Sequence, residues 1–214
     1  MAIILVAVSL LATGCDKEDE VGDWVDLGLP SGLLWATRNV GASSPEDYGD
    51  YFAWGETTTK NVYDWSTYRY CNGDTVSLTK YCNDSHYGYN GFTDNLTILQ
   101  PGDDAATVNY GGRTPTKEEW KELINNTTSQ WVAVNGVNGR RFTGTNGNSL
   151  FLPAAGYRWG SSHGSADFRG NYWSSSLDTD FLNFAWYFDF YSIGQSVYNA
   201  FRNDGLSVRA VRQK

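Results

Sequence analysis

The sequence is poor in the residues that most often hold metals and in those that break sheets. Its 214 residues include only three Cys, two His, one Met and five Pro, against nine Trp, 14 Tyr and 23 Gly. His86 and His163 have no metal-ligand spacing, so we expect no metal site and no cofactor. Abundant aromatics and glycines favour many short strands joined by turns over a helical bundle.

Basic residues are also scarce. The formal net charge is -8, and no lysine occurs between Lys121 and Lys214. An acidic chain repels a phosphate backbone, so nucleic acid is not an expected partner.

Two of the cysteines, Cys71 and Cys82, flank a short polar segment that begins with the turn signal Asn-Gly-Asp. In an oxidising compartment they could form a disulfide, and this is our tentative pairing. Two unpaired, half-buried thiols remain the alternative. The pair lies inside a polar, turn-rich stretch, residues 57–104, that we expect to be one long irregular excursion.

The third cysteine, Cys15, closes an N-terminal apolar run. Residues 2–12 are apolar except for Ser9, too few to span a bilayer as a helix, and they end in Leu-Ala-Thr-Gly-Cys. This arrangement resembles a bacterial lipoprotein signal with Cys15 as the lipidated residue, although no Lys or Arg precedes the run. We expect residues 1–14 to be the signal peptide.

An acidic segment follows the lipidation candidate at once. Asp-Lys-Glu-Asp-Glu at residues 16–20 resembles the export signal of surface lipoproteins in Bacteroides-type bacteria. We therefore expect an acidic tether over residues 15–22 and a ligand-binding domain over 23–214. The protein would then lie on the bacterial outer membrane, facing the exterior and held to the membrane only through its lipid.

Local patterns predict several elements of an α+β domain. Residues 25–36 read as two strands around a Pro-Ser-Gly turn, and Ser44 begins a short helix. The clearest helix covers residues 115–124, where Thr116 and Glu119 form a capping box. Further strands are expected at residues 131–134, 141–143, 150–157, 185–191 and 206–211.

The C-terminal part is exceptionally aromatic, with 14 aromatic residues between positions 157 and 201. Trp186, Phe188 and Phe190 alternate with Tyr187, Asp189 and Tyr191, so one side of a strand should face the core and the other water. Rigid aromatics with Asn, Asp and Arg are typical of recognition surfaces. Our candidate ligand-binding residues are Trp159, Asp178, Asp180, Asn183, Tyr187, Asp189, Tyr191, Tyr198, Asn199, Arg202 and Asn203.

Six segments together resemble the Fibrobacter succinogenes major paralogous domain family: VDLGLPSGLLWA at 25–36, YFAWGE at 51–56, PTKEE at 115–119, LPAAGYR at 152–158, YWSSS at 172–176 and LSVRAVR at 206–212. The resemblance covers nearly the whole chain after the tether. It implies a C-type-lectin-like domain related to the formylglycine-generating enzyme fold, with two helices, short strands, long loops and an irregular ligand face.

The C-terminal stretch is also similar to the variable region of proteins diversified by retroelements. In such proteins exposed Asn, Tyr, Ser, Asp and Thr vary within a fixed frame. That frame would here comprise Trp173, Ser174, Trp186, Phe188, Phe190, Val208 and Arg209.

Catalysis is not expected. Formylglycine-generating enzymes use cysteines in their C-terminal half, and this chain has none after Cys82. The calcium-binding triplets of sugar-binding lectins are missing too, since Arg202-Asn203-Asp204 lacks their Trp. We therefore expect a surface protein that binds an extracellular protein or glycan, with a structural or tip component of a surface assembly as the alternative. An enzyme of the formylglycine-generating-like fold is a distant third alternative.

Overall fold

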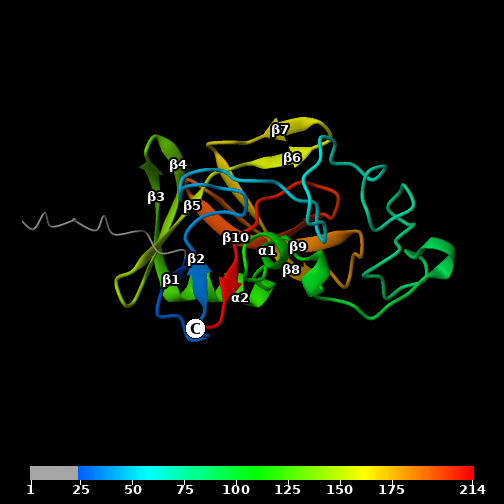
Figure 1. Ribbon diagram of the computed structural model, residues 1–214, viewed down its shortest axis with the longest axis horizontal. Coiled ribbons are helices and arrows are strands. Elements are labelled where there is room, and N and C mark those ends of the chain that lie inside the picture. The colour runs from blue at the N-terminus through cyan, green and yellow to red at the C-terminus, as the bar shows by residue number, and fades with distance from the viewer. Residues whose placement is uncertain (1–23) are drawn as a thin grey trace, which may run out of the picture.

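The computed structural model describes residues 24–214. The expected signal peptide, Cys15 and the whole of the expected tether lie outside these residues. The described chain is mixed helix and sheet, mostly β, and its strands form several small sheets (Figure 1).

The first sheet joins the two ends of the described chain. β1 (Trp24–Asp26) pairs antiparallel with β2 (Leu34–Ala36), and β2 pairs with β11 (Val211–Arg212). Between β1 and β2 the Gly32 nitrogen donates to the Leu29 carbonyl at 2.9 Å, which confirms the predicted strand–turn–strand unit. Figure 1 shows β2 beside the C-terminus.

The expected closing strand at residues 206–211 is mostly wrong. Only β11 at its end is a strand, because the preceding residues cross between different neighbours. Leu206 bridges Phe52 and Ser207 bridges Tyr172, while the Val208 carbonyl accepts from Val40 at 3.0 Å.

A three-stranded antiparallel sheet follows the main helix. β3 (Thr127–Val134), β4 (Val137–Gly144) and β5 (Ser149–Pro153) stand in sequence order. Asn135 and Gly136 connect β3 to β4 with φ of 49° and 84°, as a two-residue hairpin turn of this twist requires. Strands at 131–134 and 141–143 are thus confirmed. The strand expected at 150–157 ends at Pro153, and Tyr157 begins a different strand.

The sheet that carries the candidate site consists of β8 (Arg169–Leu177), β9 (Phe184–Tyr191) and β10 (Gly194–Phe201), in the order β10-β9-β8. A small hairpin of β6 (Tyr157–Trp159) and β7 (Ser162–Gly164) lies apart from it (Figure 1).

Two α-helices occur in the described chain. α2 (Lys117–Asn126) has the predicted capping box, since the Thr116 hydroxyl accepts from the Glu119 nitrogen at 3.2 Å and the Glu119 carboxylate accepts from the Thr116 nitrogen at 2.8 Å. α1 (Ala105–Asn109) is capped by Asp104, and short 3₁₀ turns η1 (Tyr89–Gly91) and η2 (Pro101–Asp103) precede it.

The helix expected at Ser44 does not form. The Asp47 carboxylate accepts instead from the Ser43 hydroxyl at 2.5 Å and from the Ser44 nitrogen at 3.0 Å, which closes a turn. Short polar side chains that bond their own backbone compete in this way with helix formation.

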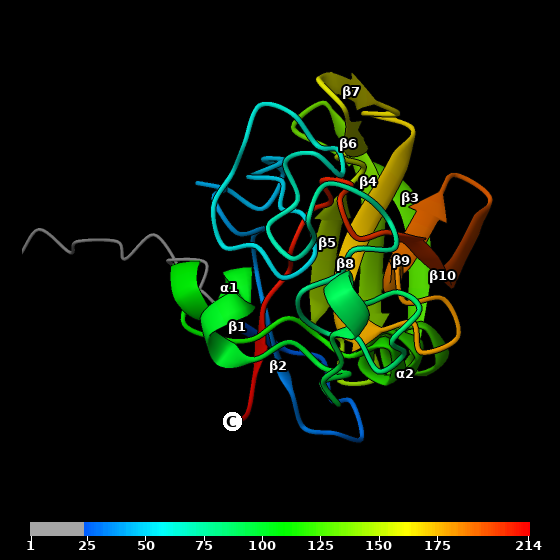
Figure 2. The same ribbon diagram turned by 90° about the vertical axis from the view of Figure 1, so that its right-hand side faces the viewer.

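α2 packs across one face of the β8–β9–β10 sheet (Figure 2). Trp120 of α2 stacks on Phe188 with ring centroids 4.9 Å apart, and its indole nitrogen donates to the Trp173 carbonyl at 3.1 Å. Tyr172 stacks on Phe190 in the same core. This face of the sheet is therefore fixed by large interlocked aromatics.

Six of the seven residues that would form the fixed frame are fully or almost fully buried: Trp173, Ser174, Phe188, Phe190, Val208 and Arg209. Trp186, which was expected to face the core, is only half-buried and lies beside the first residue of α2. The Lys117 ammonium covers its ring at 4.2 Å from the centroid.

Residues 57–104 form the irregular excursion that composition predicted, but no disulfide holds it. Cys71 and Cys82 are free thiols directed at different carbonyls, those of Trp65 and Asp84, each 3.1 Å away. Our tentative disulfide is therefore wrong in this structure.

Hydrogen bonds and aromatic packing hold the excursion instead. The Asp103 carboxylate accepts from the Tyr70 and Tyr81 hydroxyls at 2.6 Å each and from the Lys80 ammonium at 2.5 Å. These bonds keep the pKa of Asp103 below its ordinary value even though burial opposes this.

Candidate functional site

We call the face of the β8–β9–β10 sheet opposite α2 the outer face. The register of the strands determines which residues lie on it. In β9 the outer face presents Ala185, Tyr187, Asp189 and Tyr191, while Phe188 and Phe190 point to the core. Tyr198 of β10 lies directly opposite Tyr187, and a residue pair opposed in this way shares a face. The predicted alternation of sides in β9 is thus confirmed, but the expectation that Tyr187, Asp189 and Tyr191 all face water is wrong, because Asp189 is buried and Tyr187 is half-buried.

Exposure along the outer face is uneven. Ala185 and Asp189 are fully buried, whereas Tyr191 and Tyr198 are 38% and 52% exposed. The Tyr191 ring lies across Gly194, where an added Cβ would come within 2.8 Å of it. Glycine at 194 therefore lets this ring lie flat against the strand.

Two adjacent hollows lie on the outer face. One, the open hollow, encloses about 450 Å³ between Phe168, Arg169, Tyr191 and Tyr198. The other, which we call the Asp204 pocket, encloses about 310 Å³. Both volumes fall in the range of roughly 300–1,000 Å³ typical of small-molecule sites.

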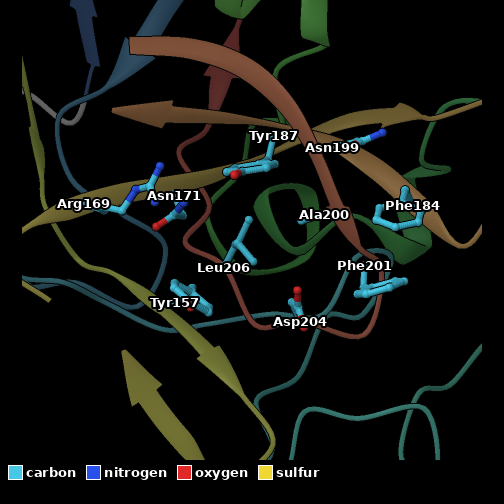
Figure 3. A pocket seen from close by; sticks show the side chains of 10 residues that line it. All are labelled: Tyr157, Arg169, Asn171, Phe184, Tyr187, Asn199, Ala200, Phe201, Asp204 and Leu206. Carbon is cyan, nitrogen blue, oxygen red and sulfur yellow. The ribbon is translucent and has the colours of Figure 1, made fainter. Parts of the chain in front are cut away.

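The walls of the Asp204 pocket differ in chemistry (Figure 3). Arg169, Asn171 and Tyr157 stand on one side, and Phe184 and Phe201 stand on the other. The Tyr187 hydroxyl points towards the polar side. The arrangement offers hydrogen-bonding groups at one end and flat apolar surface at the other.

An ion pair separates the two hollows. Arg169 donates to both carboxylate oxygens of Asp189, at 3.1 Å from Nε and 2.9 Å from Nη2. Asn171 donates to the same carboxylate at 3.1 Å. The bonds to Asp189 raise the pKa of Arg169, so this guanidinium stays charged and fixed in direction.

Asp204 enters the pocket from the loop after β10, with its carboxyl directed into the space beneath Tyr187 (Figure 3). Within residues 24–214 no hydrogen bond or ion pair of the structure reaches this carboxyl. Burial, with no other cause, raises the pKa of Asp204 to about 7. Asp204 therefore changes charge near neutral pH.

The loop that carries Asp204 is anchored by Arg202. This guanidinium is fully buried and donates to the Tyr68 hydroxyl and to the carbonyls of Lys80, Tyr81 and Leu182 at 2.9–3.1 Å. It also lies 5.0 Å from the centre of the Trp54 ring. The arginine joins the loop to the excursion.

Four candidate residues expected on the surface are buried, and for them the expectation of exposure is wrong: Asp178, Asp189, Arg202 and Asn203. Asp178 closes the turn before β9 by accepting from the Asp180 nitrogen at 3.0 Å and from the Asn199 amide at 2.6 Å. Asp189 is covered by Arg169, and Asn203 donates to the Tyr63 carbonyl at 3.4 Å.

The remaining candidates divide between the hollows and other surfaces. Tyr187, Tyr191 and Tyr198 line the hollows, with Asn199 at the border of the Asp204 pocket. The other three line neither hollow: Trp159, which is 66% exposed in β6, Asp180 and Asn183.

Sequence reasoning missed Arg169, Asn171 and Asp204. Alternation offered a signal for two of them, because Arg169 and Asn171 alternate with the buried Gly170 and Tyr172 and so share the side of Trp173. For Asp204 the sequence carried no signal, since its place depends on contacts with residues far away in the chain.

The described residues offer no metal-binding cluster, and His163 has a structural role. Among residues 24–214 no group of three His, Cys, Asp or Glu could hold a metal ion. The His163 ring bonds the Tyr51 hydroxyl and lies 2.9 Å from the Ala155 carbonyl. No helix in this part of the chain is long and apolar enough to cross a membrane.

Comparison with protein families gives one match. Residues 143–211 match the model of a domain of unknown function, DUF8237. This segment includes β8, β9, β10 and Asp204, and hence most of the walls of both hollows. Comparisons with curated proteins and with solved structures gave no significant match.

Proposed function

We propose that this protein is a lipid-anchored surface protein that binds an extracellular protein or glycan on the outer face of its β8–β9–β10 sheet. The observation that carries the proposal is the pairing of two neighbouring hollows with solvent-exposed aromatics on one rigid sheet. Such aromatics provide a large contact area at little cost in side-chain entropy.

The packing on the other face of the sheet supports this proposal. Phe188 stacks on Trp120 of α2 and Phe190 stacks on Tyr172, so Tyr191 and Tyr198 project from a backbone that is already ordered. A preorganised surface loses less entropy when a ligand binds. The C-type-lectin-like fold that we propose has the same division between a packed body and a loop-rich ligand face.

Location outside the cell is part of the same proposal, and it rests on Cys15 and the acidic segment that follows it. One diacylated cysteine would supply two acyl chains, enough for stable anchoring. The binding function does not require catalysis, and we propose none.

The test is a glycan and host-protein array probed with wild type and with Tyr191→Ala/Tyr198→Ala. Tyr89→Ala is the matched control, since Tyr89 is an exposed tyrosine that lines neither hollow. We expect a wild-type signal that the double variant lowers at least about tenfold and that the control retains. Equal signals from all three proteins would remove the outer face as the binding surface. No signal from wild type would instead favour the structural alternative, which stable recovery in a multiprotein surface assembly would support.

A further inference from the structure

The Asp204 pocket contains one charge that nothing in the described chain compensates. Arg169 and Asp189 neutralise each other at 2.9 Å, whereas the Asp204 carboxyl has no hydrogen bond or ion pair with any residue from 24 to 214. A partly buried carboxylate without a partner is unfavourable, so a ligand that supplies a partner gains from it.

The backbone that carries this carboxyl is fixed on both sides. The Asp204 nitrogen donates to the Phe201 carbonyl at 3.0 Å, and Gly205 exchanges two hydrogen bonds with Arg158 at 2.7 and 2.9 Å. Gly205 also lies against the Tyr63 ring, where an added Cβ would approach to 2.5 Å. The position of Asp204 is therefore imposed by the fold.

A second unused group in the pocket is also an acceptor. Asn171 is buried, and its amide nitrogen donates to Asp189, but its Oδ1 has no hydrogen-bond partner. The Asn171 Oδ1 is itself buried, so the Asp204 carboxyl is the acceptor that a ligand in the pocket can reach. A ligand that donates hydrogen bonds fits this carboxyl.

Aromatic rings complete the lining. Tyr187 lies above the space into which Asp204 points, and Phe184 and Phe201 are stacked with ring centroids 4.3 Å apart at its apolar end (Figure 3). Ring faces attract cations, most strongly where water is excluded.

We propose that the Asp204 pocket binds a primary ammonium group, with Asp204 as its counter-ion. An ammonium group has three N–H donors, no acceptor and one positive charge, which matches what the pocket lacks. This inference rests on the binding function proposed above and names the ligand chemistry. The ammonium group could belong to a lysine side chain or to an amino sugar, and the test distinguishes these sources.

The charged groups around Asp204 define how binding depends on pH. Arg169 and Asp189 form their pair on β8 and β9, Arg158 lies over the Tyr51 ring 5.2 Å from its centre, and His163 bonds the Tyr51 hydroxyl. Burial raises the pKa of Tyr187 to about 12 and that of Asp204 to about 7. An ammonium ligand should therefore bind about tenfold more tightly at pH 8 than at pH 6, as the deprotonated fraction of Asp204 increases.

The experiment titrates the purified full-length protein by calorimetry at pH 8 with Nα-acetyl-lysine-methylamide and with glucosamine. Nα-acetyl-norleucine-methylamide and glucose are the neutral counterparts. Each is measured against wild type, Asp204→Asn and the matched control Asp74→Asn, whose site is an exposed turn. We expect at least one amine to bind wild type and Asp74→Asn about tenfold or more tightly than its neutral counterpart, and Asp204→Asn to lose this preference. The amine with the higher affinity identifies the source.

Three results would overturn the inference: no binding of either amine, equal binding of an amine and its neutral counterpart, or unchanged amine binding by Asp204→Asn. If Asp204→Asn fails to fold, the pH series with wild type and the lysine probe decides, because that amine stays protonated from pH 6 to 8. Affinity independent of pH would then refute the role of Asp204. An array ligand that binds wild type and Asp204→Asn equally would leave the proposed function intact while removing the ammonium site.

Discussion

Replacing Arg202 with methionine separates an anchoring role from a role in ligand contact. Methionine keeps most of the side-chain volume and removes the guanidinium. The substitution abolishes four hydrogen bonds, one to the Tyr68 hydroxyl and three to buried carbonyls. It leaves those carbonyls without their donor in a region that water does not reach.

A net loss of about 3–5 kcal/mol in the free energy of unfolding is expected. A hydrogen bond to a charged group contributes about 1.5–3 kcal/mol, but four bonds of one side chain are not additive, and relief of guanidinium desolvation offsets part of their loss. At about 2–4 °C per kcal/mol for a protein of this size, the melting temperature should fall by roughly 6–20 °C.

Urea unfolding followed by tryptophan fluorescence measures the change directly. Arg141→Met is the matched control, because Arg141 is exposed in β4, and it should stay within about 0.5 kcal/mol of wild type. Wild-type stability in Arg202→Met, together with lost ligand binding, would refute the anchoring role and restore Arg202 as a contact residue.

Three further results are expected. Cys15→Ala should move the protein from the membrane fraction to the soluble fraction while Cys71→Ala leaves it there, and a Cys15 variant that remains in the membrane fraction would contradict lipidation. Folding raises the pKa of Asp204 from 3.8 to about 7, so the folded state binds this proton more tightly and loses stability as pH rises between these values. Across pH 4–8, chemical unfolding should thus show wild type losing roughly 2–4 kcal/mol more than Asp204→Asn. If a retroelement diversifies the gene, sequences from sibling strains should differ at exposed positions such as Tyr191 and Tyr198, and a locus without clustered differences between codons 160 and 204 would argue against diversification.

Local patterns predicted the parts of this fold whose interactions are local. The capping box of α2 needs only Thr116 and Glu119, and the alternation of β9 follows from the pleat of a single strand. The irregular excursion at 57–104 was predicted because its apolar residues follow neither helical nor strand periodicity. In each case the residues that determine the structure are close together in sequence.

The residues that cover the outer face of β9 could not be predicted in this way. Alternation places Tyr187, Asp189 and Tyr191 on one side, but it does not show that Arg169, 20 residues before Asp189, covers that carboxylate. The same holds for Arg202, whose partners include Tyr68, 134 residues away in sequence. Polar residue types that suggest a binding surface also serve as buried anchors, and only tertiary contacts distinguish the two.

The separation of anchors from exposed aromatics has a consequence for ligand specificity. Arg202 and Asp189 are both buried, and each is hydrogen-bonded to more than one residue, so a substitution at either should cost stability before it changes recognition. Tyr191 and Tyr198 are exposed on the outer face of the same sheet, where a new side chain meets mainly solvent or ligand. The open hollow can therefore change its preference while the Asp204 pocket keeps its geometry. On this reasoning, related proteins would share the ammonium site and differ in what surrounds it.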